Sequence, residues 1–383
     1  MLDDLDLAVL TKRPGAKWAL ATARGALPAW VADMDFPVAE PIRDALVEAV
    51  HTDLGYPAWD DKPGENPLAE AFADRMETRY GYLPQPAHVR VFTEVIQALQ
   101  AVLHVATQPG DAVAMHTPSY PPFVQTLEAM GRRLIPIPML DTDEGWSFDA
   151  DRLATDVAQQ RCRALILVNP HNPTGRVFSA DELSALTEIA QRHDLLVISD
   201  EIHAELTFRP HRHLPFAALA PDLAARTVTL TSASKAFNLA GLRCSVADVA
   251  PASVRAALDA LPPVLLGQSS SLGVIGTLAA WRHGGPWLAE VLTLLDRNRK
   301  LVADGLPREV RYHLPQATYL AWLDWRALGL GDDPAAALLA RNKVMLSRGP
   351  DFGPGGPGYA RLNFATSEPI LAEILRRLST AES

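Results

Sequence analysis

Short apolar runs alternate with segments of helical periodicity between about residues 40 and 250. Five of the runs have the length of buried strands, namely residues 111–115, 134–137, 164–168, 195–199 and 227–230. Between them, apolar side chains recur at helical intervals in residues 95–106, 123–130 and 181–193. This alternation predicts an α/β fold with a mostly parallel sheet between helices. Ligands of such sheets bind at the carboxyl ends of the strands.

After about residue 260 the pattern changes to longer helical segments, at 271–280 and 286–305, followed by strand-like residues 319–324 and 359–364. A last helical pattern covers residues 368–378. We expect a smaller α+β domain here, completed by the start of the chain, because 383 residues exceed what one core usually holds. The predicted division is residues 1–40 joining the small domain, 41–260 as the large ligand-binding domain, and 261–383 as the small domain.

Charge and cysteine content narrow the class of protein. The chain has 35 basic and 45 acidic residues, a net charge of −10, which argues against nucleic acid or an anionic membrane surface as partner. The most apolar stretch, residues 89–106, is broken by polar side chains and is no membrane span. Cys162 and Cys244 form no metal-spaced pair, and the acidic N-terminus lacks the basic start of a signal peptide. We therefore expect a cytoplasmic protein without a metal site.

Lys235 follows the strand predicted at 227–230, in the sequence SASKAFN. A lysine at the mouth of a buried strand, beside Ser232 and Ser234, suits a Schiff base to an aldehyde cofactor whose phosphate the serines hold. Desolvation there favours the neutral, nucleophilic amine. The alternative is a solvated cation, the commoner state of a lysine at a strand end.

Two further polar residues follow predicted strands. Asp200 ends the strand at 195–199, where a carboxylate is costly without a partner, and it could keep a pyridinium nitrogen protonated so that the ring accepts electrons. The alternative is a helix cap or a surface-facing strand end. Asn172 lies between two prolines after the strand at 164–168, where its amide could hold a phenolate oxygen. The alternative there is turn chemistry alone.

Seven motifs, in this order, resemble the fold type I pyridoxal-phosphate enzymes of the aminotransferase class I/II superfamily, and within them the cystathionine β-lyase-like C–S lyases. They are WVADMDFP at 30–37, GY at 55–56, PSY at 118–120, PHNPTG at 170–175, SDEIH at 199–203, SASK at 232–235 and RLN at 361–363. The resemblance extends over nearly the whole chain and implies pyridoxal 5′-phosphate as cofactor.

The resemblance implies a role for each residue that matches a motif. Lys235 would carry the cofactor, Asp200 would pair with its ring nitrogen, and Asn172 would bind its phenolic oxygen, with His203 near the same edge. Tyr120 would lie against the ring face; the alternative is ordinary aromatic packing. These residues would surround the ring on every side.

The phosphate and the substrate carboxylate need separate anion sites. The resemblance assigns the phosphate to Ser232, Ser234 and the backbone N–H groups of Glu94 and Val95 at a helix start. Tyr56 would reach the phosphate of a neighbouring subunit, which implies a homodimer with shared sites. Arg361 would bind the substrate α-carboxylate, with Asn172 beside it; the alternative is a surface ion pair.

Two residues depart from the pattern of the lyase branch. Glu94 puts a carboxylate beside a phosphate dianion, so its side chain has to point away for the phosphate assignment to hold. Arg243, eight residues after Lys235, stands where aminotransferases of this fold carry a phosphate-binding arginine. It favours phosphate binding and also transamination.

The function implied by the resemblance is β-elimination on a sulfur amino acid such as L-cystathionine, which releases a thiol, pyruvate and ammonia. An aminotransferase would use the same residues, and a pyridoxal-phosphate-binding regulatory protein with little turnover would use most of them. The small-molecule amino-acid substrate itself is not determined by the sequence.

Overall fold

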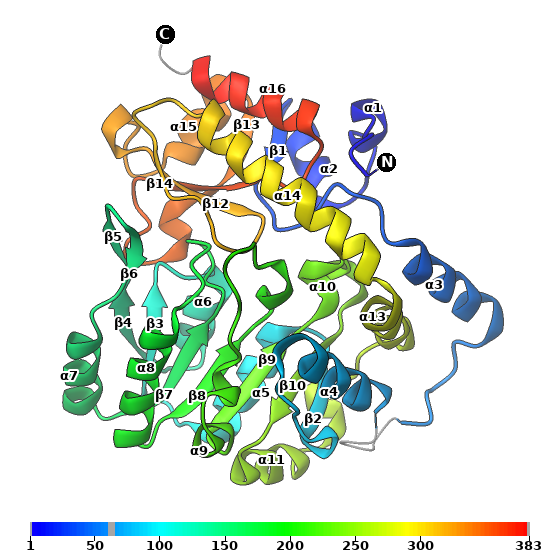
Figure 1. The fold of residues 1–383 in the computed structure, drawn as a ribbon, viewed down its shortest axis with the longest axis vertical. Coiled ribbons are helices and arrows are strands. Elements are labelled where there is room, and N and C mark those ends of the chain that lie inside the picture. The colour runs from blue at the N-terminus through cyan, green and yellow to red at the C-terminus, as the bar shows by residue number, and fades with distance from the viewer. Residues whose placement is uncertain (1, 60–65, 381–383) are drawn as a thin grey trace.

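A computed structural model describes residues 2–59 and 66–380 of the protein, and two sheets organise this part of the chain (Figure 1). The larger sheet has the strand order β2-β10-β9-β8-β7-β3-β4, and the smaller one β1-β13-β14-β12-β11. All neighbours in the larger sheet are parallel except those of β10, which is antiparallel to β9 and β2. The predicted α/β fold with a mostly parallel sheet is confirmed.

The five strands predicted in the large sheet all form, with ends shifted by at most two residues. They are β3 (Ala112–Thr117), β4 (Arg133–Pro138), β7 (Cys162–Val168), β8 (Leu196–Asp200) and β9 (Thr227–Thr231). Two strands were not predicted, β2 (Val89–Phe92) and β10 (Ser245–Val249). Polar Asp248 interrupts the apolar pattern of β10, yet it is buried because the Tyr82 hydroxyl donates to its carboxylate at 3.2 Å.

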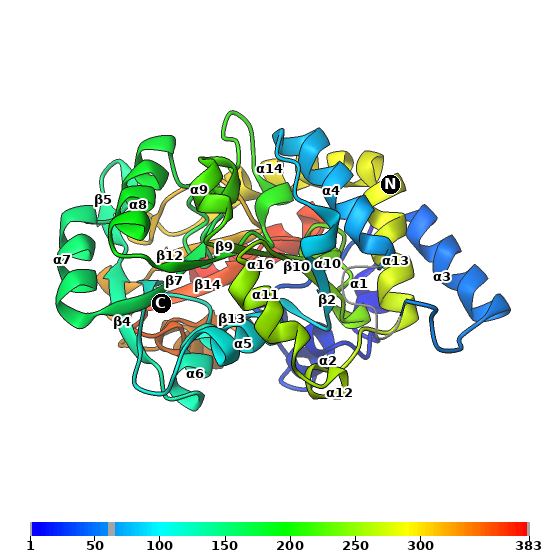
Figure 2. The same cartoon turned by 90° about the horizontal axis from the view of Figure 1, so that it is seen from below.

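Both faces of the large sheet are buried, so its central strands are apolar at nearly every position. Along β7, Leu165 and Leu167 face one core and Ile166 and Val168 the other. One side is covered by α5 (Val95–Ala106), α6 (Pro121–Ala129) and α11 (Ala252–Asp259), and the other by α7 (Ala150–Gln160), α8 (Ala180–Arg192) and α9 (Pro221–Ala224). Figure 2 shows α5, α6 and α11 on the side opposite α8 and α9.

The small sheet combines the two ends of the chain. Its strands are β1 (Leu27–Ala29), β11 (Arg311–Tyr312), β12 (Leu320–Asp324), β13 (Val344–Arg348) and β14 (Tyr359–Asn363). β1 pairs with β13 in parallel, and α14 (Gly285–Gly305), α15 (Pro334–Asn342) and α16 (Glu368–Ser379) pack around the sheet. Buried Asn298 of α14 donates to the carbonyls of Phe364 and Thr366, which fastens the helix to the end of β14. The domain boundaries at residues 40 and 260 stay predictions.

Four of the remaining α-helices are formed by residues 7–80, and the other three precede or follow β10 in the sequence. They are α1 (Leu7–Leu10), α2 (Ala16–Thr22), α3 (Glu40–Thr52), α4 (Pro67–Tyr80), α10 (Ala233–Ala236), α12 (Pro263–Leu266) and α13 (Ser271–His283); β5 (Leu140–Thr142) and β6 (Gly145–Ser147) form a hairpin. Figures 1 and 2 both show α3 at the edge of the molecule.

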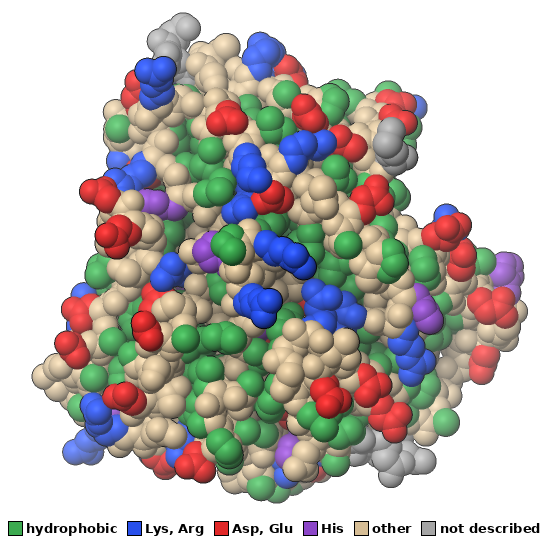
Figure 3. Space-filling view, viewed as in Figure 1, with side chains coloured by type: hydrophobic (Ala, Val, Ile, Leu, Met, Phe, Trp, Pro, Cys, Tyr) green, Lys and Arg blue, Asp and Glu red, His purple; other side chains and the backbone are tan. Residues whose placement is uncertain are grey.

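Apolar side chains reach the face shown in Figure 3 in small groups among charged ones of both signs. Within the described residues no helix is long and apolar enough to cross a bilayer. Most of the large apolar side chains are buried in the cores, whereas α3 and the segment after it expose Val47, Val50, Leu54 and Tyr56.

Candidate active site

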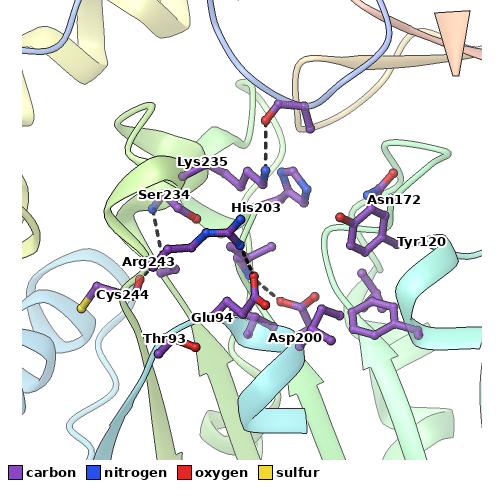
Figure 4. Close-up of a pocket in the computed structure, with 18 residues that line it drawn as sticks. Thr93, Glu94, Tyr120, Asn172, Asp200, His203, Ser234, Lys235, Arg243 and Cys244 are labelled. Carbon is purple, nitrogen blue, oxygen red and sulfur yellow. Dashed lines mark hydrogen bonds and ion pairs between the residues drawn. The ribbon is translucent and has the colours of Figure 1, made fainter. Parts of the chain in front are cut away.

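A cavity lies at the carboxyl ends of β7, β8 and β9, where the N-terminus of α5 meets them (Figure 4). It collects ten of the twelve residues that the sequence singled out: Glu94, Val95, Tyr120, Asn172, Asp200, His203, Ser232, Ser234, Lys235 and Arg243. The carboxyl ends of parallel strands are where such sheets bind ligands. Arg361 does not line the cavity, but it donates a hydrogen bond to Asn172, which does. Tyr56 is not among the residues that line the cavity.

Lys235 projects from α10, the short helix that follows β9. Its Nζ donates to the carbonyl oxygen of Ala32 at 3.0 Å, and burial lowers the pKa of this amine. Asp33 and Asp200 oppose that shift, while Arg361 and Arg243 add to it. The lysine is therefore no solvated surface cation, and its neutral form is accessible at lower pH than in water.

Asp200 is the last residue of β8 and is 4 % exposed. Its Oδ1 accepts a hydrogen bond from the backbone N–H of Ile202 at 3.0 Å, but burial raises the pKa of the carboxyl to about 7. Neighbouring His203 is buried with no partner for its Nδ1, and burial lowers its pKa to about 3. A protonated ring nitrogen of a bound cofactor, placed beside Asp200, would supply a positive charge that stabilises the ionised carboxylate.

Arg361 is in β14 of the small sheet and is buried, not part of a surface ion pair. Its Nη1 donates to Asn172 Oδ1 at 2.9 Å, and its Nη2 donates to Trp30 O and Ser347 Oγ, both at 3.2 Å. Its Nε has no partner, and burial lowers the pKa of the guanidinium to about 10. A buried guanidinium with a free donor is suited to a carboxylate ligand. Asn172 is thus more than a turn residue, because it orients this group.

Tyr120 precedes α6 at the cavity wall, with its ring edge-on to that of Phe123 at a centroid distance of 5.8 Å. Burial raises the pKa of its hydroxyl, which stays protonated at neutral pH. The Tyr120 ring thus packs against another aromatic ring and also lines the cavity. The two roles considered for this residue, aromatic packing and contact with a cofactor ring, are compatible.

The end of the cavity near α5 holds the groups assigned to phosphate. Ser234 lines the cavity, but Ser232 caps α10: its Oγ accepts from Ser234 N and donates to Cys244 O at 2.6 Å. Ser232 therefore cannot also donate to a phosphate in this geometry. The N-terminus of α5 begins at Val95 without a side-chain cap, which leaves its first N–H groups free for an anion.

Glu94 does not point away from the cavity. Its Oε2 lies 2.5 Å from Nη1 of Arg243, and Figure 4 shows both side chains reaching toward each other across the cavity. Both side chains are exposed to solvent, so this is a surface ion pair that contributes little to stability. An incoming phosphate would have to compete with Glu94 for this arginine.

Tyr56 is 96 % exposed and lies beyond α3, so this chain brings it to no site of its own. Sequence reasoning also missed residues that line the cavity, among them Ala32, Ile202 and Cys244. Ala32 belongs to the WVADMDFP motif, but it contributes through its backbone carbonyl, which no side-chain pattern reveals.

The described residues include groups that suit the aldehyde, the ring nitrogen and the phosphate of pyridoxal 5′-phosphate. They provide a half-buried lysine with a lowered pKa, a buried carboxyl in need of a cation, and a helix start with free N–H groups. Arg361, hydrogen-bonded to the lining residue Asn172, adds a guanidinium beside the cavity, and its Nε has no partner among the described residues.

Asp200→Asn should change how the stability of the ligand-free protein depends on pH. Between its ordinary value of about 4 and its folded value of about 7, Asp200 holds a proton only in the folded state, so its contribution to stability is lost as pH rises through this window. We expect the variant to gain melting temperature over wild type as pH rises from 5 to 8. Urea or thermal unfolding at both pH values, with exposed Asp143→Asn as control, measures it. An unchanged slope would contradict the assignment.

The chain is similar to proteins of known family along nearly its full length. The model of the family "Aminotransferase class I and II" matches residues 33–378. The chain is 37 % identical to cystathionine beta-lyase PatB of Bacillus subtilis, over 94 % of this chain and 93 % of that one, and 33 % identical to a cystathionine beta-lyase of Corynebacterium glutamicum, over 98 % of each. A crystal structure of a putative PLP-dependent beta-cystathionase from Corynebacterium diphtheriae superposes with a TM-score of 0.90 at 31 % identity, covering 98 % of both chains. With its lysine, aspartate and arginine placed as described, the chain belongs to the aminotransferase class I and II family.

Proposed function

We propose that this protein is a pyridoxal-phosphate-dependent C–S β-lyase, which converts L-cystathionine or a related S-substituted cysteine to a thiol, pyruvate and ammonia. The observation that carries the proposal is one cavity in which half-buried Lys235 and buried Asp200 lie together with Asn172, which binds Arg361. The relatives named cystathionine beta-lyase support the choice of reaction.

When bound, pyridoxal phosphate supplies an aldehyde that links to amines and a protonated ring that accepts the electrons left by a departing Cα proton. Lys235 would hold the aldehyde, and Asp200 would face the ring nitrogen and keep it protonated. His203, Asn172 and Tyr120 would enclose the ring. The ring charge would in turn satisfy Asp200, whose carboxyl is otherwise pushed toward protonation by burial.

The chain's own groups perform the proton and substrate handling. Arg361 binds the substrate α-carboxylate and so orients the Cα–H bond across the ring plane. Lys235, when its amine is free and neutral, would take the Cα proton as general base. A thiolate leaves from Cβ without a strong acid behind it because thiols are acidic enough. The remaining enamine is released and hydrolyses to pyruvate and ammonia.

The phosphate would bind at the start of α5, to the N–H groups of Glu94 and Val95, with Ser234 and Arg243 beside it. This requires the Glu94 carboxylate to leave Arg243, because a dianion and a carboxylate cannot share one guanidinium at no cost. Glu94 is thus expected to weaken cofactor binding.

We also infer a homodimer whose subunits complete each other's sites. The outer face of α3 and the segment after it expose Val47, Val50, Leu54 and Tyr56, an apolar surface at the edge of the molecule. A second copy of the chain would cover this surface and receive Tyr56 near its phosphate. The two free, buried cysteines fit the cytoplasmic location that we propose.

The reaction is tested by incubating the protein with L-cystathionine and no 2-oxo acid. We expect pyruvate and free thiol in equal amounts. Lys235→Ala should lose both products and the visible band of lysine-bound cofactor, because no other amine replaces it in the cavity. Turnover only after addition of a 2-oxo acid would instead identify an aminotransferase. A yellow protein that turns over L-cystathionine neither alone nor with a 2-oxo acid would be a pyridoxal-phosphate-binding protein without either activity.

Glu94→Gln should tighten cofactor binding several-fold, since it removes the charge that competes with phosphate for Arg243. Titration of the cofactor-free protein with pyridoxal phosphate, followed by absorbance, gives the dissociation constant. Glu188→Gln, on the surface of α8, is the control. Weaker binding in Glu94→Gln would show that the carboxylate assists the site.

Mixing subunits tests the shared site. Tyr56→Ala and Lys235→Ala should each have little activity alone, but dimers formed from both contain one intact site. A 1:1 mixture should regain about a quarter of wild-type activity, because half of the dimers are mixed and each has one working site. No recovery in mixtures that contain mixed dimers would mean that Tyr56 does not act across the interface.

A further inference from the structure

The backbone carbonyl of Ala32 receives two hydrogen bonds inside the active site. Lys235 Nζ donates to it at 3.0 Å, and the Tyr319 hydroxyl donates to it at 2.8 Å. A carbonyl oxygen has two lone pairs, so both donors are accommodated. Among the described residues no other hydrogen-bond partner of Lys235 Nζ is found. Ala32 is therefore where the free amine rests.

Tyr319 is held rigidly between the two sheets. It is 1 % exposed and immediately precedes β12, and its own carbonyl accepts from Phe364 N at 3.0 Å. The residue before it, Thr318, adopts a left-handed conformation with φ of 73° and donates its N–H to Leu206 O at 3.0 Å. The ring of His203 stands edge-on to the tyrosine ring. The hydroxyl thus reaches Ala32 from a fixed position.

We propose that Tyr319 is a positioning residue that holds the Ala32 carbonyl as the resting place of the Lys235 amine while the lysine is detached from the cofactor. The inference rests on the proposed function, in which the free Lys235 amine takes the Cα proton. A detached amine in a buried site needs a hydrogen-bond acceptor, since an unpaired buried polar group is costly.

This resting place suits a general base. A neutral amine that donates one N–H to Ala32 keeps its lone pair free to accept the Cα proton. After the transfer it is an ammonium group, which donates to the same carbonyl more strongly. The Tyr319 hydroxyl, whose pKa burial raises, stays protonated and always takes one lone pair of the carbonyl. It therefore fixes the direction of the carbonyl and limits how strongly the ammonium form is held.

Other charged groups also act on Lys235 and set the background for any pH profile. Asp33 comes from the segment after β1, Asp200 from the end of β8, Arg361 from β14 and Arg243 from the loop before β10. His203 also interacts electrostatically with Lys235, and its ring contacts that of Tyr319. Tyr319→Phe keeps this ring and leaves all five groups in place, so a change in titration reports on the Ala32 carbonyl.

The test compares Tyr319→Phe with Tyr312→Phe. Tyr312 is the matched control, because its hydroxyl also donates to a backbone carbonyl, that of Arg299 at 3.3 Å, in the same sheet but outside the active site. Three measurements are made on each variant. They are kcat and KM for L-cystathionine, the rate at which holoenzyme exchanges the Cα proton of L-alanine in D₂O, and the pH dependence of acylation of Lys235 in the cofactor-free full chain, followed by peptide mass spectrometry.

For Tyr319→Phe we expect kcat and the exchange rate to fall about fivefold to tenfold, the loss typical of one buried hydrogen bond, with KM nearly unchanged. The acylation midpoint of Lys235 should move up by roughly half a pH unit, because the freed carbonyl binds the ammonium form better. Tyr312→Phe should match wild type in all three.

Wild-type exchange and acylation in Tyr319→Phe, or equal changes in both variants, would overturn the role. Proton exchange from L-alanine needs no leaving group, so it separates this inference from the lyase reaction. Absence of pyruvate from L-cystathionine, together with slowed exchange and a shifted midpoint in Tyr319→Phe, would refute the lyase and still support the positioning role.

Discussion

Two ionisable groups that line one cavity, Lys235 and Asp200, determine the character of this structure, and neither forms a salt bridge with another described residue. Burial lowers the pKa of Lys235 and raises that of Asp200, so each is pushed toward its neutral form. Asp200 ends β8 and Lys235 lies in α10, and the chain could have opposed both pKa shifts by pairing the two groups closely. It keeps them apart on either side of a cavity instead. A ligand that reacts with the amine and brings a cationic nitrogen to the carboxylate satisfies both at once.

Much of the large sheet could be predicted because its central strands are buried on both faces. Such strands are apolar at nearly every position, and that makes β7 and β8 visible in the sequence. β10 was missed because Asp248 is buried by virtue of Tyr82, a residue far away in the chain. A tertiary hydrogen bond of this kind leaves no local pattern. β2 was missed because it has only four residues, Val89–Phe92, and Arg90 interrupts their apolar pattern.

The site was predictable where a side chain follows a strand, as with Lys235, Asp200 and Asn172. Arg361 was identified through the family resemblance alone, because nothing local distinguishes a buried arginine from an exposed one. The pairing of Glu94 with Arg243 and the capping role of Ser232 depend on side-chain conformation, which spacing does not determine. The Ala32 carbonyl lies outside any sequence signal, since every residue has one.

The parallel pairing of β1 with β13 has a consequence for synthesis of the protein. A ribosome produces β1 at the start and its partner close to the end, so the N-terminal segment waits without its sheet while the large domain can already fold. Ala32, only three residues beyond β1, is carried into place by that late pairing. In nascent chains that end before β13, the large domain would therefore be folded while Lys235 lacks the Ala32 carbonyl as its hydrogen-bond acceptor.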